Sequence, residues 1–200
     1  MSAPFDIRAW IFRYRSYTPL PFLVVMVLFA RPTITSLVVG FAMVVLGEGI
    51  RFWGVSIAGA ETRTTGRVGG TYLITTGPFA HVRNPLYLGN MIMYAGVGVM
   101  SMALFPWLLL AAVVWFYVQY SLIISREEEY LAAQFGGAYD DYRKHVPRFL
   151  PRLTPYRTED PPPKRMNIAE GLASERRTLQ AMALVTLLVV GVYVVRSVTG

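Results

Sequence analysis

Two apolar runs of about twenty residues each follow one another almost without interruption, and they constrain the fold of this 200-residue chain more than any other feature. The runs, 86–104 and 106–124, contain no Asp, Glu, Lys or Arg. A helix of about twenty residues spans the ~30 Å hydrocarbon core of a bilayer. The first polar block, 77–89, leads into the hairpin and the second, 126–148, follows it. Two membrane helices with so short a turn return both blocks to the same side.

The composition supports a membrane location. Hydrophobic residues make up 54% of the chain and charged residues 16%, with a mean hydropathy of +0.42, whereas a soluble domain carries about 25% charged residues. The formal net charge of +7 is explained by basic cytoplasmic loops, so we predict no nucleic-acid partner. The absence of cysteine excludes thiol chemistry. Two histidines are too few for most histidine-based metal sites, so no metal is predicted.

We predict an all-α, polytopic membrane protein with about five transmembrane helices, a helical hairpin core and a cytoplasmic C-terminal catalytic segment. The runs 20–30, 37–57 and 179–195 supply the other three helices, although the first is short. In this arrangement the basic residues before, between and after the spans fall on one side, and only Arg31 and Arg196 fall on the other. The positive-inside rule then places the N-terminus and both polar blocks in the cytoplasm.

The predicted organisation has four parts. Residues 1–58 hold the N-terminal spans, and 59–150 form the catalytic membrane core with its loop, hairpin and cytoplasmic helices. Residues 151–177 contain a proline-rich linker and a short interfacial helix, and 178–200 form a C-terminal transmembrane helix. The sequence assigns no function to this last span, for which packing or oligomerisation is the default, and it leaves the oligomeric state open.

The first polar block combines a turn with a helix start. Gly77-Pro78 is a turn signal, and Asn84-Pro85 fits the cap and first position of a helix. Asn84 can therefore be a cap and nothing more. Alternatively, the unpaired N–H groups and the positive dipole end of this helix can receive an anionic group of a cofactor or substrate.

Two features inside the predicted spans have both a structural and a functional interpretation. Gly96 and Gly98 either allow close helix packing or leave a groove in which a flat ligand lies against the backbone. Glu48 and Arg51 are three residues apart and share a helix face. Charges inside a membrane are costly, so this pair is either a buried ion pair or part of the lining of a site.

The second polar block begins with three acids at the end of a span. Glu127 and Glu128 can accept hydrogen bonds from hydroxyl or ammonium groups, whereas Glu129 fits a solvated face. After Gly136-Gly137, a short helix places Tyr139, Tyr142, Arg143 and Val146 on one face and stops at Pro147. Tyrosine and arginine near a membrane interface are often anchors. Arg143 can equally hold a carboxylate by two hydrogen bonds.

Taken together, the two blocks resemble those of the isoprenylcysteine carboxyl methyltransferase family and its relatives among the phospholipid N-methyltransferases. The resemblance covers about half of the chain, from Glu48 to Pro151, and depends on the order and spacing of several short motifs. These are Gly77-Pro78, Val82-Arg83-Asn84-Pro85-Leu86-Tyr87, Gly96/Gly98, Glu127-Glu128-Glu129-Tyr130-Leu131, Phe135-Gly136, Tyr139/Tyr142 and Val146-Pro147.

The resemblance implies a cytoplasm-facing pocket for S-adenosyl-L-methionine and a lipid or prenylated substrate in the bilayer. The residues that it implies for the cofactor are His81, Arg83, Tyr87, Gly96, Gly98, Glu127 and Glu128. The residues that it implies near the acceptor are Arg143, Tyr139 and Asn84. The implied reaction is direct methyl transfer, most simply to a carboxylate of the isoprenylcysteine type.

One position departs from the family pattern. The family often has histidine where this chain has Asn84, and asparagine does not titrate near neutral pH. An acceptor that needs no deprotonation, such as a carboxylate, is therefore favoured. A phospholipid amine would need a base, and His81, a glutamate or water is available nearby.

Two other functions remain open on the sequence. Membrane sterol and enone reductases share an Arg-His-Pro-x-Tyr block and use NADPH, but the adjacent glutamates, the Phe-Gly and Val-Pro pairs and the short chain favour the methyltransferases. A non-catalytic membrane protein that retains the fold would bind neither cofactor.

Overall fold

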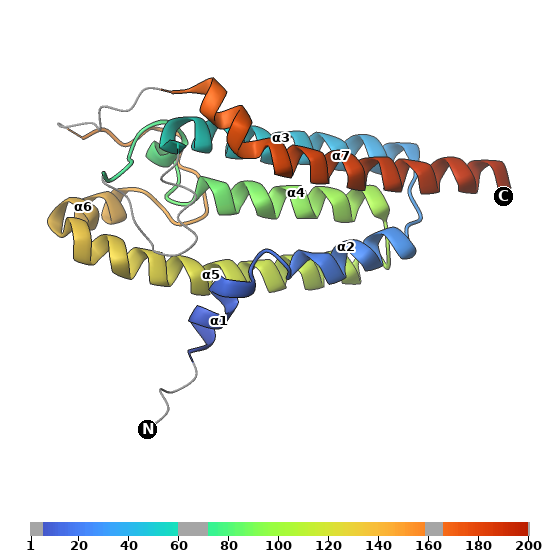
Figure 1. Cartoon of the computed structure of the whole chain (residues 1–200), viewed down its shortest axis with the longest axis horizontal. Coiled ribbons are helices and arrows are strands. Elements are labelled where there is room, and N and C mark those ends of the chain that lie inside the picture. The colour runs from blue at the N-terminus through green and yellow to red at the C-terminus, as the bar shows by residue number, and fades with distance from the viewer. Residues whose placement is uncertain (1–5, 60–71, 159–165, 200) are drawn as a thin grey trace. The chain divides into compact units, whose positions relative to one another are not determined.

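A computed structural model describes residues 6–59, 72–158 and 166–199, and in these residues the chain is helical and without strands. This confirms the predicted all-α fold (Figure 1). Within these ranges, six α-helices and a 3₁₀ helix precede the long C-terminal helix. In chain order they are α1 (Ile7–Tyr14), α2 (Pro19–Leu28), α3 (Ile34–Ala58), η2 (Gly77–Ala80), α4 (Pro85–Ser101), α5 (Trp107–Phe135), α6 (Gly137–His145) and α7 (Ile168–Thr199).

The helix ends follow local rules that the sequence makes visible. Proline occupies the first position of α2 and of α4, where its missing N–H costs no hydrogen bond. α5 ends before Gly136, whose φ of +51° suits glycine. α6 ends where Val146 turns to an extended conformation before Pro147. These ends match the predicted helix start at Pro85 and the predicted stops at 136 and 147.

Three helices in the described part of the chain are long and apolar enough to cross a membrane: α3, α5 and α7. Of the other apolar helices, α4 has 17 residues and spans about 25 Å at 1.5 Å per residue, and α2 has ten and spans about 15 Å. The chain is an integral membrane protein, and the number of five spans stays a prediction.

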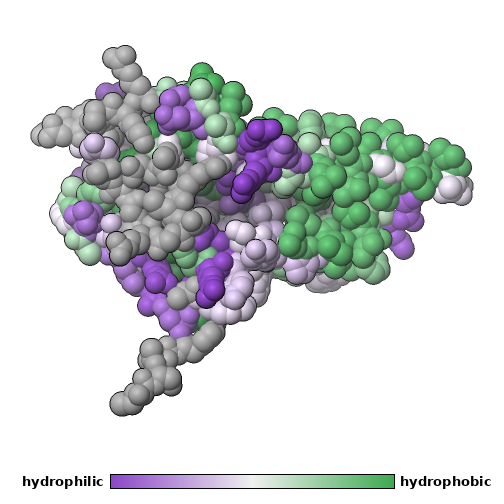
Figure 2. All heavy atoms as spheres, in the orientation of Figure 1, coloured by the Kyte–Doolittle hydropathy of each residue, from purple (hydrophilic) through white to green (hydrophobic). Residues whose placement is uncertain are grey.

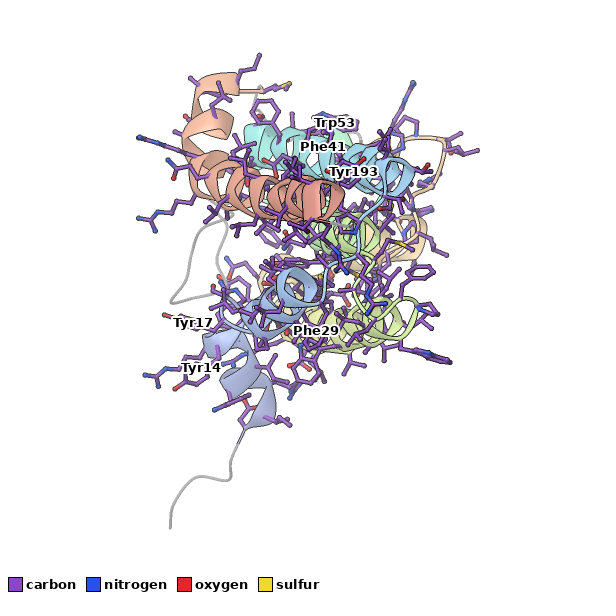
Figure 3. All side chains as sticks on the ribbon, turned by 90° about the vertical axis from the view of Figure 1, so that its right-hand side faces the viewer. Tyr14, Tyr17, Phe29, Phe41, Trp53 and Tyr193 are labelled. Carbon is purple, nitrogen blue, oxygen red and sulfur yellow. The ribbon has the colours of Figure 1, made fainter. Side chains whose placement is uncertain are left out.

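The chain forms two compact units. Unit 1 comprises Met1–Val44, Tyr94–Arg126 and Ala183–Gly200, and unit 2 comprises Val45–Met93 and Glu127–Met182. Unit 1 is largely apolar. Figure 2 shows hydrophobic side chains over its part of α7, where Leu184, Leu187 and Val198 are among the exposed residues. Figure 3 labels exposed aromatic side chains of the same unit, including Tyr17, Phe29 and Phe41. Lipid can cover such a surface, and aromatic residues are typical of membrane interfaces.

Several helix ends meet within unit 1. The backbone N–H of Arg31 donates to the Ser101 carbonyl at 2.7 Å. The Arg196 guanidinium donates from Nη1 to the Ala30 carbonyl at 2.8 Å. The end of α2, the end of α4 and the end of α7 therefore come together. The two arginines that the topology prediction placed on the same side, Arg31 and Arg196, do lie at the same end of unit 1.

One predicted boundary differs from the structure. The sequence indicated a separate interfacial helix from Ile168 to Arg177 ahead of a span at 179–195. Instead, α7 is one continuous helix of 32 residues. No proline interrupts 168–199, so nothing in the local sequence forces a break where the polar face ends. Part of the predicted linker, 159–165, and most of the predicted loop ahead of the hairpin, 60–71, lie outside the described residues.

Candidate functional site

Unit 2 brings the two predicted polar blocks together around a turn before α4. Gly77 begins η2 with a φ of +61°, a conformation that favours glycine. A β-carbon at this position would come within 2.9 Å of Ile57 in α3, so the close approach also requires glycine. The next residues carry the chain to Pro85, the first residue of α4. The loop that carries His81 and Arg83, two residues that the resemblance implies for the cofactor, is therefore held against the end of α3.

Glu128 is the centre of this site. Its residue is 7% exposed, and its carboxylate binds two guanidinium groups. Nη2 of Arg83 forms an ion pair with Oε1 at 3.0 Å, while Arg148 donates from Nη2 to Oε2 and from Nε to Oε1. Arg83 also donates from Nη1 to the carbonyl oxygens of Arg143 and Val146. One acid from α5 thus joins the loop before α4 to the segment after α6.

Glu127 makes a separate contact with the same helix start. The Tyr87 hydroxyl donates to Oε1 of Glu127 at 2.7 Å. Asn84 donates from Nδ2 to the Arg148 carbonyl at 3.3 Å. Four of the residues predicted for the site, Arg83, Asn84, Tyr87 and Glu127, therefore contact the second polar block or belong to it. Glu128, a fifth predicted residue, joins this group through its ion pairs with Arg83 and Arg148.

The tyrosines of α6 form a buried hydrophobic cluster beside the Arg83–Glu128–Arg148 charges. Tyr139, Tyr142 and Val146, three of the four residues of the predicted helix face, are buried together. The Tyr142 hydroxyl donates to the Phe79 carbonyl at 2.7 Å and so ties α6 to η2. Burial, and then the Glu128 carboxylate, raise the pKa of the Tyr139 phenol to about 12. Tyr139 therefore stays neutral at physiological pH, where it can donate a hydrogen bond but cannot act as a phenolate base.

The raised pKa of Tyr139 predicts a loss of stability at high pH. Because the folded-state pKa lies above the ordinary value of 10.0, the contribution to stability is complete below pH 10. It is lost as the pH rises from 10 towards 12. We expect the melting temperature to fall in this range, and to fall less in Tyr139→Phe. Melting curves at about pH 9, 10 and 11 test this, and an equal fall in the two proteins would contradict it.

Two predicted residues lie elsewhere in unit 2. The Arg143 side chain is 52% exposed and pairs with Asp140 at 3.2 Å, so it is turned away from the buried face of α6. Only its carbonyl reaches Arg83. His81 donates from Nδ1 to the Arg152 carbonyl at 2.8 Å, because a carbonyl can only accept, and its ring lies 6.3 Å from that of Trp53.

Gly96 and Gly98 belong to unit 1, where both pack against other helices. A β-carbon at Gly96 would come within 2.7 Å of the Gly40 carbonyl oxygen and 2.9 Å of the Val44 nitrogen. At Gly98 it would meet the Leu109 side chain at 2.8 Å. These contacts are those of close helix packing, and the groove interpretation stays a prediction.

Arg148 is a residue of this cluster that the sequence pattern does not single out. It ends the second polar block, directly after Val146-Pro147, and counts among the basic residues that set the topology, but the sequence pattern gives it no role in the site. In the structure it is half-buried against Glu128. The three-residue cluster Arg83–Glu128–Arg148 carries one more positive than negative charge, which suits an additional carboxylate.

Some buried polar atoms near these residues have no hydrogen-bond partner in the described part of the chain. They include Nε of Arg83 and Oγ1 of Thr75, which lies in the same loop. Buried donors without partners are uncommon and point to a ligand or to ordered solvent. Among the described residues, no group of three or more His, Asp or Glu side chains is placed to hold a metal ion.

Comparisons with known proteins address the same region. A family model described as phospholipid methyltransferase matches residues 35–138, just over half of the chain. A protein-S-isoprenylcysteine O-methyltransferase of Schizosaccharomyces pombe is 38% identical over 81 residues, which is 40% of this chain and 34% of that protein. No solved structure matches.

Two bacterial relatives have names that refer to metal resistance. The nickel-cobalt-cadmium resistance protein NccN of Alcaligenes xylosoxydans xylosoxydans is 36% identical over 89 residues, 44% of this chain and 40% of the relative. The cobalt-zinc-cadmium resistance protein CzcN of Cupriavidus metallidurans is 36% identical over 87 residues, 44% and 39% respectively. The chain thus matches about two fifths or less of the length of each curated relative. With the matched family region covering α3, α4 and α5, this chain belongs to the phospholipid methyltransferase family of membrane proteins.

Proposed function

We propose that the protein transfers a methyl group from S-adenosyl-L-methionine to a lipid-borne acceptor, with a carboxylate of the isoprenylcysteine type as the first candidate. The observation that carries the proposal is the buried Glu128 between Arg83 and Arg148, in a chain of this family. Burial of charged groups is energetically unfavourable, so a buried charge cluster beside the start of α4 and in the last turns of α5 is typical of a functional site.

The chemistry of these side chains fits the cofactor. S-adenosyl-L-methionine carries a carboxylate, an ammonium group and ribose hydroxyls. The unpartnered Nε of Arg83 can donate to the carboxylate. Glu127 and Glu128 can accept from the ammonium group and the hydroxyls. We therefore assign cofactor binding to Arg83, Tyr87, Glu127 and Glu128, with His81 at the edge.

When bound, the sulfonium cofactor supplies an electrophilic methyl group. The chain's own residues bind and orient the two reactants and exclude water from them. This is the main contribution expected of a protein to a direct displacement. Arg148 binds Glu128 through Nε and Nη2 and is the more exposed arginine of the cluster, so we assign the acceptor carboxylate to its side of the cluster. Arg143 could contribute only by turning from the surface and leaving Asp140. Asn84 and neutral Tyr139 orient groups but remove no proton, which a carboxylate acceptor does not require.

A phospholipid amine is the second candidate acceptor. The description of the matching family model names phospholipid methyl transfer. An amine must lose a proton, and His81 offers a base because its Nδ1 faces the Arg152 carbonyl, which leaves Nε2 as the acceptor of the neutral ring. The pH dependence of methylation separates the two acceptors, since only the amine requires a deprotonated base.

The proposed location follows the charge distribution. Most basic residues precede or follow the spans on the side of the two polar blocks, so we assign the site to the cytoplasmic side of the membrane. A substrate would reach it from the bilayer, and the cofactor from water. The partners are therefore membrane lipids and a lipid or prenylated substrate.

The first experiment is binding of S-adenosyl-L-methionine and of NADPH to the protein in lipid nanodiscs, measured side by side by calorimetry. Saturable binding of the sulfonium cofactor alone is expected, and a screen of lipid acceptors would follow. Binding of NADPH alone would overturn the proposal in favour of a reductase. Binding of neither by a protein shown to be folded would favour a non-catalytic membrane protein.

Replacing Tyr87 by phenylalanine is expected to weaken cofactor binding. The substitution removes the hydroxyl that holds Glu127 at 2.7 Å and leaves the ring in place. Glu127 then loses the hydrogen bond that orients it, so we expect the Kd to rise, by up to about tenfold. Calorimetry measures the change, with the exposed Tyr72→Phe as the control. An unchanged Kd would remove Tyr87 and Glu127 from the assigned site.

A further inference from the structure

The first half of α7 contacts α3 along one face. α7 lies outside the residues that the family model matches. Asn167, Gly171 and Glu175 are spaced four apart and so share a helix face. The backbone N–H of Asn167 donates to the Ser56 carbonyl at 2.8 Å. A β-carbon at Gly171 would clash with Ser56, so glycine permits this close approach.

Glu175 ends this line of contacts with a charge pair. Its residue is 2% exposed, and both of its carboxylate oxygens accept from Nη2 of Arg51, at 2.8 and 2.7 Å. Arg51 is 13% exposed and donates from Nη1 to Oδ1 of Asn90 in α4 at 2.7 Å. One guanidinium therefore joins three helices of unit 2.

Glu48 also lies beside Arg51 but does not fix its direction. Its Oε2 is 3.6 Å from Nε of Arg51, and neither of its carboxylate oxygens has a hydrogen-bond partner in the described residues. The sequence paired Arg51 with Glu48 alone. The structure gives the short, directional contacts of Arg51 to Glu175 and Asn90 instead, so Glu175 determines where the guanidinium points.

Arg51 in turn touches the part of α4 that carries the site. A β-carbon at Gly89 would come within 2.6 Å of Cγ of Arg51, so the two are already in close contact. Asn90 follows Tyr87 by three residues on the same helix, and Tyr87 holds Glu127. A shift of Arg51 would therefore be transmitted to the first turns of α4.

We propose that Glu175 is a positioning residue for the methyl-transfer site, acting through Arg51 and Asn90 on the start of α4. The inference rests on the proposed function. It gives the C-terminal helix a role in the reaction, where the sequence offered only packing or oligomerisation. Glu175 itself touches neither cofactor nor acceptor.

The test compares Glu175→Gln with Glu170→Gln in nanodiscs. Glu170 lies in the first turn of the same helix and is exposed, so it controls for the loss of one negative charge from α7. We expect Glu175→Gln to raise the Kd of S-adenosyl-L-methionine about tenfold, and Glu175→Asp, which keeps the charge, to recover part of the loss. The control should bind as the wild type does. The Kd is measured by calorimetry, and kcat, KM and the melting temperature are recorded for each variant.

Each result has a distinct meaning. A lower melting temperature with an unchanged Kd and unchanged kinetic constants would overturn the inference, because Glu175 would then be structural only. Higher activity in Glu175→Gln would also overturn it, since Glu175 would be competing with substrate for Arg51. Wild-type protein that is folded but does not bind the cofactor would overturn the proposed function and this inference with it. If Glu175→Gln does not fold, Gly171→Ala tests the same docking sterically and should raise the Kd in the same direction.

Discussion

Glu128→Ala is expected to abolish cofactor binding and to destabilise the protein by about 3 kcal/mol. The substitution leaves two guanidinium groups facing each other without the acid that holds them. Removing one partner of a buried ion pair costs about 3–5 kcal/mol. The lower end applies here because Arg148 is one-third exposed and can turn to solvent, whereas Arg83, at 11%, cannot. Thermal melting and calorimetric titration with S-adenosyl-L-methionine measure the two effects.

Two controls separate the effects of charge and position. Glu129→Ala removes the next acid of the same helix, which is exposed and outside the Arg83–Glu128–Arg148 cluster, and should leave cofactor binding unchanged. Glu128→Gln keeps the shape of the side chain and should stay folded more readily than Glu128→Ala, yet bind cofactor weakly. Intact binding and turnover in Glu128→Ala would show that this acid is not part of the site.

The fold was largely predictable because the hydrocarbon core of a membrane limits the choices. A backbone that crosses it must satisfy its own hydrogen bonds, so long apolar runs become helices. The short helix α6 was also predictable, because Gly136-Gly137 precede it and Pro147 follows it in the sequence. The exact length of a membrane span was harder to predict, because α4 has 17 residues where the sequence predicted a span of nineteen residues, 86–104. The continuity of α7 could not be inferred from composition, since its polar and apolar halves join without a local signal.

The sequence predicted which residues of the candidate site lie together, but not which of them pair with one another. The spacing of the two blocks is enough to bring Arg83, Tyr87, Glu127 and Glu128 into one group. The hydrogen bond between Tyr87 and Glu127 joins residues 40 positions apart, and the choice between Arg143 and Arg148 depends on how α6 turns. The pair of Arg51 with Glu175 spans 124 positions. A sequence pattern based on helical spacing reveals the neighbour Glu48, three residues away, but cannot reveal a partner on another helix.

Gly96→Ala is expected to destabilise the protein by about 2–3 kcal/mol. The added methyl group would come within 2.7 Å of the Gly40 carbonyl oxygen and 2.9 Å of the Val44 nitrogen. Both are backbone atoms of α3, which cannot turn aside as a side chain can, so α3 and α4 must separate. Overpacking of this kind costs about 1–3 kcal/mol. Small residues at such crossings are typical of membrane helices.

Two other glycines provide matched controls for Gly96. A methyl group added at Gly49 in α3 would have no atom within 4 Å, so Gly49→Ala should be neutral or stabilising by up to about 1 kcal/mol. Gly98→Ala meets mainly the flexible end of Leu109 and should have an intermediate effect. Thermal melting ranks the three variants, and cofactor titration of the folded fraction decides the role of Gly96. Normal stability with a raised Kd would favour the groove over packing, because a ligand, and not α3, would then be what the methyl group displaces.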